Sequence, residues 1–133
     1  MKPLKQLLIT GVLLFTSNAF AAHVECLISG TPTKQTFAAD YCSSVVNSTP
    51  GVVFRFVSDK PVAEVKWSFS ADGSSTRSCG TSSQCIVNFP RTTSGYYEVP
   101  ACVTRVLYTD GTWESVSYCA TGAFRTLSGN PSN

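Results

Sequence analysis

Six cysteines constrain the fold of this chain more than any other feature of its sequence. They are Cys26, Cys42, Cys79, Cys85, Cys102 and Cys119. An even number of cysteines in a short exported chain predicts a set of disulfides, which stabilises a domain whose core is small. Many pairings are possible, so the pairing has to be deduced from how the cysteines lie on neighbouring strands.

The start of the chain predicts export across a membrane. Lys2 and Lys5 precede an apolar stretch over residues 7–15, and Ala19-Phe20-Ala21 places small residues at the positions that a signal peptidase recognises. The apolar stretch is shorter than the roughly 20 residues of a transmembrane helix. We therefore expect a secreted or periplasmic protein, of a bacterial type, that is not inserted in the membrane once its signal is cleaved.

These features divide the chain into a signal peptide over 1–21, a single domain over 22–126 and a flexible tail over 127–133. Cleavage removes two of the ten basic residues and leaves eight, against eight acidic residues, so the mature chain is formally neutral. Nucleic acids and anionic membrane surfaces bind clustered cationic charge. Neither is therefore expected as a partner.

A hairpin signal near the carboxyl end narrows the disulfide pairing. Asp110-Gly111 lies between two β-prone segments, and this dipeptide is typical of a two-residue hairpin turn. With that turn Thr109 faces Thr112, and counting seven residues along each strand places Cys102 opposite Cys119. The sequence therefore predicts a Cys102–Cys119 disulfide.

The other four cysteines then divide into two pairs. Cys79 and Cys85 lie close together and predict a local disulfide loop, which leaves Cys26 to pair with Cys42. No Cys-x-x-Cys spacing occurs, so a zinc site or a redox site is not expected. We expect no metal and no cofactor.

The remaining pattern predicts an all-β domain. Residues 62–70 alternate between apolar and polar side chains, as a half-buried strand does. Residues 30–44 are predicted to be irregular and residues 71–84 to form a loop. Short strands separated by turn signals indicate a sandwich or barrel. The expected strands cover 23–29, 52–57, 62–70, 85–89, 96–108 and 113–124.

Two short motifs resemble those of the PKD-type immunoglobulin-like domains. Residues 65–73, Val-Lys-Trp-Ser-Phe-Ser-Ala-Asp-Gly, are similar to the W-x-F-x-D-G strand and turn of that family, with one inserted residue. Residues 94–99, Ser-Gly-Tyr-Tyr-Glu-Val, look like its P-G-x-Y-x-V segment. The resemblance spans about residues 50–122 and implies an antiparallel immunoglobulin-like β-sandwich, here stapled by three disulfides. It also implies a non-catalytic extracellular module.

The residues offer little for catalysis. The mature chain has one histidine, His23, at its extreme amino end, and its carboxylates are scattered without a motif that pairs them. Acid–base and nucleophilic catalysis both need a firmly held proton acceptor. We therefore expect a protein that is not an enzyme.

Two places are candidate binding sites. In the predicted hairpin register Tyr108 faces Trp113, and both are expected to be exposed near the tip, where aromatic rings can stack on sugars or anchor a protein. The opposite face of the hairpin, which includes Val103 and Leu107, is expected to face the core. Ser82 and Gln84 in the Cys79–Cys85 loop are the second candidate.

Three functions remain open on the sequence alone. The first is a secreted or periplasmic binding or accessory module that recognises a protein or a carbohydrate outside the cytoplasm. The second is a small extracellular enzyme inhibitor or effector that presents the disulfide loop. The third is a structural component of the cell surface, such as a pilus subunit, for which an unpaired edge strand would be the discriminating feature.

Overall fold

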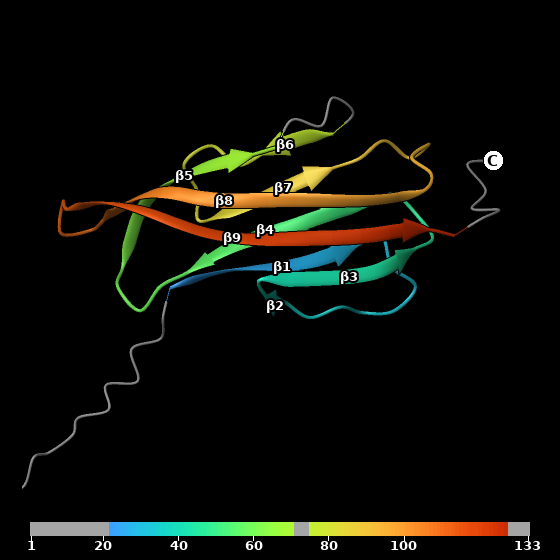
Figure 1. Cartoon of the computed structure of the whole chain (residues 1–133), viewed down its shortest axis with the longest axis horizontal. Coiled ribbons are helices and arrows are strands. Elements are labelled where there is room, and N and C mark those ends of the chain that lie inside the picture. The colour runs from blue at the N-terminus through green and yellow to red at the C-terminus, as the bar shows by residue number, and fades with distance from the viewer. Residues whose placement is uncertain (1–21, 71–74, 128–133) are drawn as a thin grey trace, which may run out of the picture.

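The computed structural model describes residues 22–70 and 75–127, and every regular element in these ranges is a β-strand (Figure 1). The predicted signal peptide and residues 128–133 of the predicted tail lie outside the described residues. Leu127 lies inside them and donates its amide to the carbonyl of Val46 at 3.0 Å. The strands are β1 His23–Ser29, β2 Ala38–Ala39, β3 Tyr41–Val46, β4 Gly51–Val57, β5 Val62–Phe69, β6 Thr76–Ser78, β7 Gln84–Asn88, β8 Tyr96–Tyr108 and β9 Trp113–Thr126.

The strands form two sheets that pack face to face (Figure 1). One sheet has the order β2-β1-β4-β7-β6 and the other has the order β3-β9-β8-β5. The prediction of an all-β, two-layered domain is confirmed. In the described ranges, no helix is long and apolar enough to cross a membrane.

The expectation of a purely antiparallel sandwich is wrong at one strand pair, because β3 runs parallel to β9. The chain changes sheets at Asp40, whose φ of 68° lies in the left-handed region that Asp tolerates better than most residues. The amide of Asp40 donates to Val24 in one sheet, and its carbonyl accepts from Thr121 in the other. This corner turns the chain so that β3 enters the second sheet in the direction of β9.

The prediction that residues 30–44 are irregular is wrong for its second half. β2 and the start of β3 lie there, and β3 buries Cys42 and Val46 while Tyr41 and Val45 face outward. Its apolar residues are few and are separated by serines, so the alternation is too short to recognise in the sequence. Likewise, β6 lies inside the predicted 71–84 loop.

Aromatic side chains fill the space between the sheets. The Phe54 ring of β4 contacts the rings of Trp67 and Phe69 on β5, with centroids 6.4 and 6.5 Å apart. At the other end Phe89 packs against Phe124 of β9 at 4.9 Å. The core therefore joins strands of both sheets, and Trp67 lies at its border, partly buried against it.

All three predicted disulfides are present, and each joins a different pair of strands or strand ends. Cys26–Cys42 joins β1 to β3 and so links the two sheets covalently through the core. Cys102–Cys119 joins the long strands β8 and β9 within one sheet. Cys79–Cys85 closes the connection between β6 and β7.

The hairpin turn differs from the predicted two-residue turn, although its disulfide is as predicted. The amide of Tyr108 donates to Thr112, and the amide of Gly111 donates to Tyr108. The loop therefore has three residues and ends at Gly111, whose φ is 87°. As a result Trp113 faces Leu107 instead of Tyr108.

A bulge further along the hairpin restores the predicted register. Val103 faces Tyr118 and Arg105 faces Ser115, so the single residue Thr104 lies opposite two residues of β9. The shift at the turn and the shift at this bulge cancel, and Cys102 therefore still faces Cys119. Between turn and bulge, every residue of β8 has a different partner from the predicted one.

The irregularity at Thr104 also exchanges the two faces of β8. Before Thr104, the odd-numbered residue Val103 is buried. After Thr104, the even-numbered residues Val106 and Tyr108 are buried instead. Arg105 points outward, and Leu107 is only partly buried. The expected core face is therefore confirmed at Val103 and wrong near the tip.

Gly122 of β9 is expected to tolerate no larger residue. A Cβ built there would lie 2.4 Å from Cγ1 of Val52 on the opposite sheet. Gly122→Ala should lower the free energy of unfolding by about 1–3 kcal/mol, because a tightly packed interface has to separate. Urea denaturation measures this change.

The same experiment on a double variant tests the cause. Gly122→Ala combined with Val52→Ala should be destabilised by less than the sum of the two single variants, because the second change makes room for the first. Additive losses would contradict a clash between these side chains.

Candidate binding site at the hairpin tip

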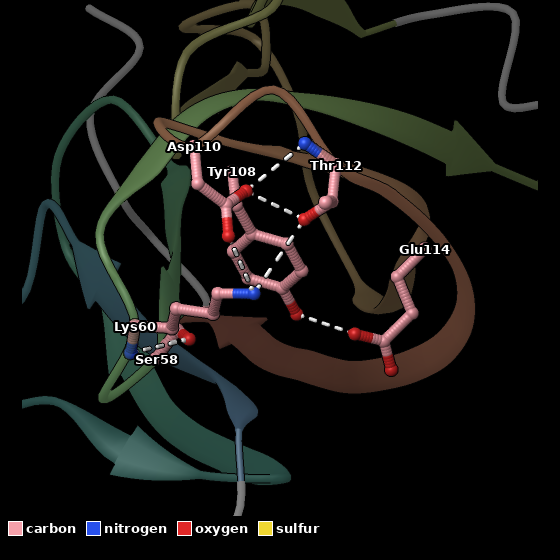
Figure 2. A network of polar contacts seen from close by, with 6 residues as sticks. All are labelled: Ser58, Lys60, Tyr108, Asp110, Thr112 and Glu114. Atoms are coloured by element: carbon pink, nitrogen blue, oxygen red, sulfur yellow. Dashed lines mark hydrogen bonds and ion pairs between the residues drawn. The ribbon is translucent and has the colours of Figure 1, made fainter.

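A network of polar contacts fixes the tip of the β8–β9 hairpin (Figure 2). One oxygen of Asp110 accepts from the amide and the hydroxyl of Thr112, at 2.9 and 2.6 Å. Its other oxygen pairs with Nζ of Lys60 at 3.1 Å. The amide of Thr109 also donates to the carbonyl of Pro61. The tip is therefore attached to the turn between β4 and β5.

These contacts shift the pKa of Asp110. The hydrogen bonds from the Thr112 hydroxyl and amide, together with Lys60, lower the pKa of Asp110 from 3.8 to about 2. Each of these groups stabilises the charged carboxylate. Asp110 therefore remains ionised, and keeps its contacts, through nearly the whole acid range.

The prediction that Tyr108 is exposed is wrong. Only 7% of Tyr108 is accessible, since the three-residue turn directs its side chain to the inner face. Its hydroxyl donates to Glu114 at 2.7 Å, and the Lys60 ammonium lies 4.3 Å from the centre of its ring (Figure 2). The hydrogen bond to Glu114 raises the pKa of Tyr108 to about 12. Tyr108 therefore supports the tip and is not a contact surface.

Trp113 is exposed as predicted, with 49% of its surface accessible. The guanidinium carbon of Arg105 lies 4.2 Å from the centre of the Trp113 ring, in a cation–π contact. Lys66 of β5 lies directly opposite Arg105 in the neighbouring strand. The outer face of the sheet thus brings an aromatic ring and two cations together.

The Cys79–Cys85 loop forms the other side of this region. Three successive carbonyls of the loop accept hydrogen bonds from the sandwich: Thr81 from the Val65 amide, Ser82 from the Trp67 indole and Ser83 from the Phe56 amide. The distances are 3.0, 2.7 and 2.8 Å. Because Phe56 lies on β4 and Val65 on β5, the loop connects the two sheets.

A cleft of about 280 Å³ lies between the loop and the hairpin tip. It runs over β5, the edge strand of its sheet. Its lining combines two indole rings, two cations and one carboxylate with the loop backbone. The lining residues are Glu64, Val65, Lys66, Trp67, Gly80, Thr81, Arg105 and Trp113.

The structure does not place Ser82 and Gln84 in this cleft. Both are exposed and line a more open depression with Ser78, Cys79, Gly80 and Ile86. The Ser82 hydroxyl accepts from the amide of Gln84 at 3.2 Å, so it stabilises the loop. An inhibitory contact through these two side chains stays a prediction.

Sequence reasoning missed Lys66, Trp67 and Arg105 as members of one site. Trp67 lies at an apolar position of the alternating segment 62–70; its ring borders the core, and its indole N–H faces the loop. The polar positions of the alternating segment 62–70 could have suggested Lys66 as outward-facing. No sequence signal reports the bulge that turns Arg105 outward beside it.

A second polar cluster lies on β1 and β4. Nε2 of His23 lies 3.0 Å from Oε1 of Glu25, and Arg55 pairs with Oε2 at 2.6 Å. Burial raises the pKa of Glu25, but the hydrogen bonds from His23 and Arg55 outweigh it, and the net shift is downward. Across residues 22–70 and 75–127, no three His, Cys, Asp or Glu side chains are grouped to hold a metal ion.

Comparisons with known proteins add no identification. No protein-family model matches the chain, and no curated protein matches it. One solved structure is similar, that of a nucleoside hydrolase-related hypothetical protein from Saccharophagus degradans that is associated with carbohydrate metabolism. The match has a TM-score of 0.40 and 14% identity, and it covers 79% of this chain and 26% of that one. A similarity this small supports no inference.

Asp110 makes the stability of the tip depend on pH in a defined window. Its pKa is lower in the folded chain than the ordinary value of 3.8, so its ionised form contributes stability above about pH 4 and loses that contribution toward about pH 2. Asp110→Asn should therefore be less stable than the wild type by a constant amount above about pH 4, and this difference should shrink below it.

Urea denaturation at a series of pH values measures the difference. Asp59→Asn is the matched control, because Asp59 is exposed in the adjoining turn and has no ion pair within the described part of the chain. A difference between wild type and Asp110→Asn that stays constant down to pH 2 would show that the carboxylate is not held as described.

Proposed function

We propose that this chain is a non-catalytic binding module with an immunoglobulin-like fold that works outside the cytoplasm. Its ligand site is the cleft beneath Trp113. The observation that carries this proposal is an exposed tryptophan beside the hairpin tip that makes a cation–π contact with an arginine and lines a cleft. Aromatic and arginine side chains in such places dominate binding energy.

The strand order supports the immunoglobulin-like assignment. Such domains pair strands A, B, E and D in one sheet and C, F and G in the other. In this chain β1, β4, β7 and β6 are neighbours in the same order, and β5, β8 and β9 occupy the second sheet. Of the PKD-like motifs, Trp67 lies on β5 and Tyr97 packs against the core from β8, whereas Asp72-Gly73 lies outside the described residues.

The disulfides support a location outside the cytoplasm. The chain has three disulfides, and structural disulfides form and persist in oxidising surroundings such as the periplasm and the extracellular space. The predicted signal peptide points to the same compartments. The module is therefore either secreted or periplasmic.

The composition of the cleft supports binding without chemistry. Among residues 22–70 and 75–127, its lining has one carboxylate, Glu64, and no histidine. General acid–base hydrolysis commonly needs two positioned proton carriers. The cleft instead presents rings and fixed charges, which suit recognition.

Replacing Trp113 tests the proposed site. Trp113→Ala should weaken binding to any ligand found on a glycan array or in a pull-down from the native compartment by at least about tenfold, since central aromatic anchors contribute about 2 kcal/mol. Tyr96→Ala is the control, because Tyr96 is similarly exposed, at 54%, and lies at the end of the neighbouring strand β8 that is far from the tip.

Both variants should keep the wild-type circular dichroism and Tm, since neither ring is part of the core. Binding that survives Trp113→Ala but is lost in Tyr96→Ala would move the site to the other end of the sheet. Hydrolysis of the captured ligand would contradict a non-catalytic role.

A structural role is the second candidate, and the edge strand β3 favours it. Proteins usually protect exposed strand edges with charge, short length or a covering loop. β2 has two residues, β6 has three and carries Arg77, and β5 is bound by the disulfide loop. β3 has six residues and no charge, and its Tyr41 and Val45 are 51% and 43% exposed.

The backbone of β3 is also open on its outer side. Asp40 and Val46 direct their carbonyls to β9, so the residues at odd positions direct theirs away from it. Within the described ranges these carbonyls and amides have no strand partner, and Val45 accepts only its neighbour's hydroxyl, from Ser44 at 3.4 Å. The edge is therefore competent to add a strand of another copy.

Val45→Lys tests this second role, because a charge on the edge should prevent strand addition. Sedimentation velocity should show concentration-dependent association of the wild type and a monomer for Val45→Lys. Ser68→Lys, on the outer face of β5, is the control and should associate like the wild type. A wild type that stays monomeric at the highest soluble concentration would reject self-assembly through β3.

A further inference from the structure

Two like charges lie side by side on the outer face of the second sheet. Lys66 and Arg105 are direct partners in the antiparallel β5–β8 pair, and both are exposed. Like charges in directly opposite positions destabilise a sheet. An acidic residue at one of the two positions would remove this repulsion.

No acidic side chain in the described part of the chain neutralises this pair. The ion pairs there join His23 to Glu25, Arg55 to Glu25 and Lys60 to Asp110. Glu64, the carboxylate that lines the same cleft, forms none with either cation. The two cations therefore leave the cleft with an excess of positive charge, although the mature chain as a whole is formally neutral.

Trp113 holds Arg105 in a geometry that suits an anion. With its guanidinium 4.2 Å from the indole centre, Arg105 has lost much of the freedom of its side chain. The N–H donors of a guanidinium lie in its plane, and stacking over a ring leaves their edge free to bind both oxygens of a carboxylate. Lys66 is then placed to contact the same anion.

The loop beside the cleft argues against a peptide strand as the ligand. A peptide that added to the edge of β5 would need the Val65 amide, which donates to Thr81 at 3.0 Å. The Trp67 indole is likewise held by Ser82 at 2.7 Å. What remains available is an aromatic surface beside charged and hydroxyl groups, and this combination matches a sugar ring with polar substituents.

We propose that the cleft binds an acidic saccharide, a sugar whose ring carries a carboxylate, with that carboxylate between Lys66 and Arg105 and the sugar ring against Trp113. The inference rests on the proposed binding function and names its ligand class. Glu64 and the Thr81 hydroxyl line the same cleft and can bind ring hydroxyl groups. Binding relieves the repulsion between the two cations.

Isothermal titration calorimetry with oligogalacturonate and oligomannuronate tests the proposal. At least one of these uronate oligosaccharides should bind, and its methyl ester, which has the same rings without the charge, should bind at least about tenfold more weakly. Affinity should also fall as salt is raised, because the carboxylate is recognised partly by charge.

Variants assign the charge recognition to the two cations. Lys66→Gln and Arg105→Gln should each lose at least about tenfold in affinity for the acidic oligosaccharide, whereas Arg125→Gln should bind as the wild type does. Arg125 is an exposed arginine on β9 of the same sheet and is the matched control. Lys66→Gln should in addition raise Tm, because it removes one of two repelling charges.

Each other outcome has a defined meaning. Equal binding of the acid and its ester would overturn the charge assignment and leave the Trp113 cleft as a binding site. Stronger binding of a polyglutamate peptide of similar length would overturn the saccharide in favour of an acidic protein. Failure of both uronates to bind would overturn this inference, while a ligand captured through Trp113 would still support the proposed function.

Discussion

The register of the β8–β9 hairpin is the constraint on which the rest of the structure depends. Cys102–Cys119 fixes that register covalently in the middle of the sheet. Between the disulfide and the tip, one extra residue on β9 and a three-residue turn change which side chains face the core. Tyr108 therefore turns inward beneath Lys60, and Arg105 turns outward beside Trp113. The candidate site is a direct consequence of these two local irregularities.

The other two disulfides stabilise the parts of the sandwich that surround the hairpin. Cys26–Cys42 holds β1 against β3, so the two sheets are linked on the side away from the cleft. On the cleft side, the Cys79–Cys85 loop connects the sheets through three backbone carbonyls. The disulfides also restrict the conformations of the unfolded chain, so a domain of this length is stable with a smaller hydrophobic core. The cleft is therefore built between rigid parts, which reduces the entropy cost of binding.

Much of the fold could be predicted from the sequence, because disulfide number and strand alternation are strong signals. The three pairings, the limits of β1 and β8 and the start of β5 were predicted correctly. β3 could not be predicted, since its direction depends on the corner at Asp40. The Cys102–Cys119 pairing was right although the turn that suggested it was wrong, because the bulge at Thr104 compensates. The position of a bulge depends on how neighbouring strands pack. The residues that line the cleft could therefore not be predicted from the sequence alone.

Nuclear Overhauser effects between Hα protons test the central claim most directly. In antiparallel sheets these protons approach closely in non-hydrogen-bonded pairs, where strands come nearest. The register described above predicts such effects between Leu107 and Trp113 and between Arg105 and Ser115. Effects between Tyr108 and Trp113 and between Val106 and Ser115 would instead show a two-residue turn, with Arg105 on the other face and no cation pair beside the cleft.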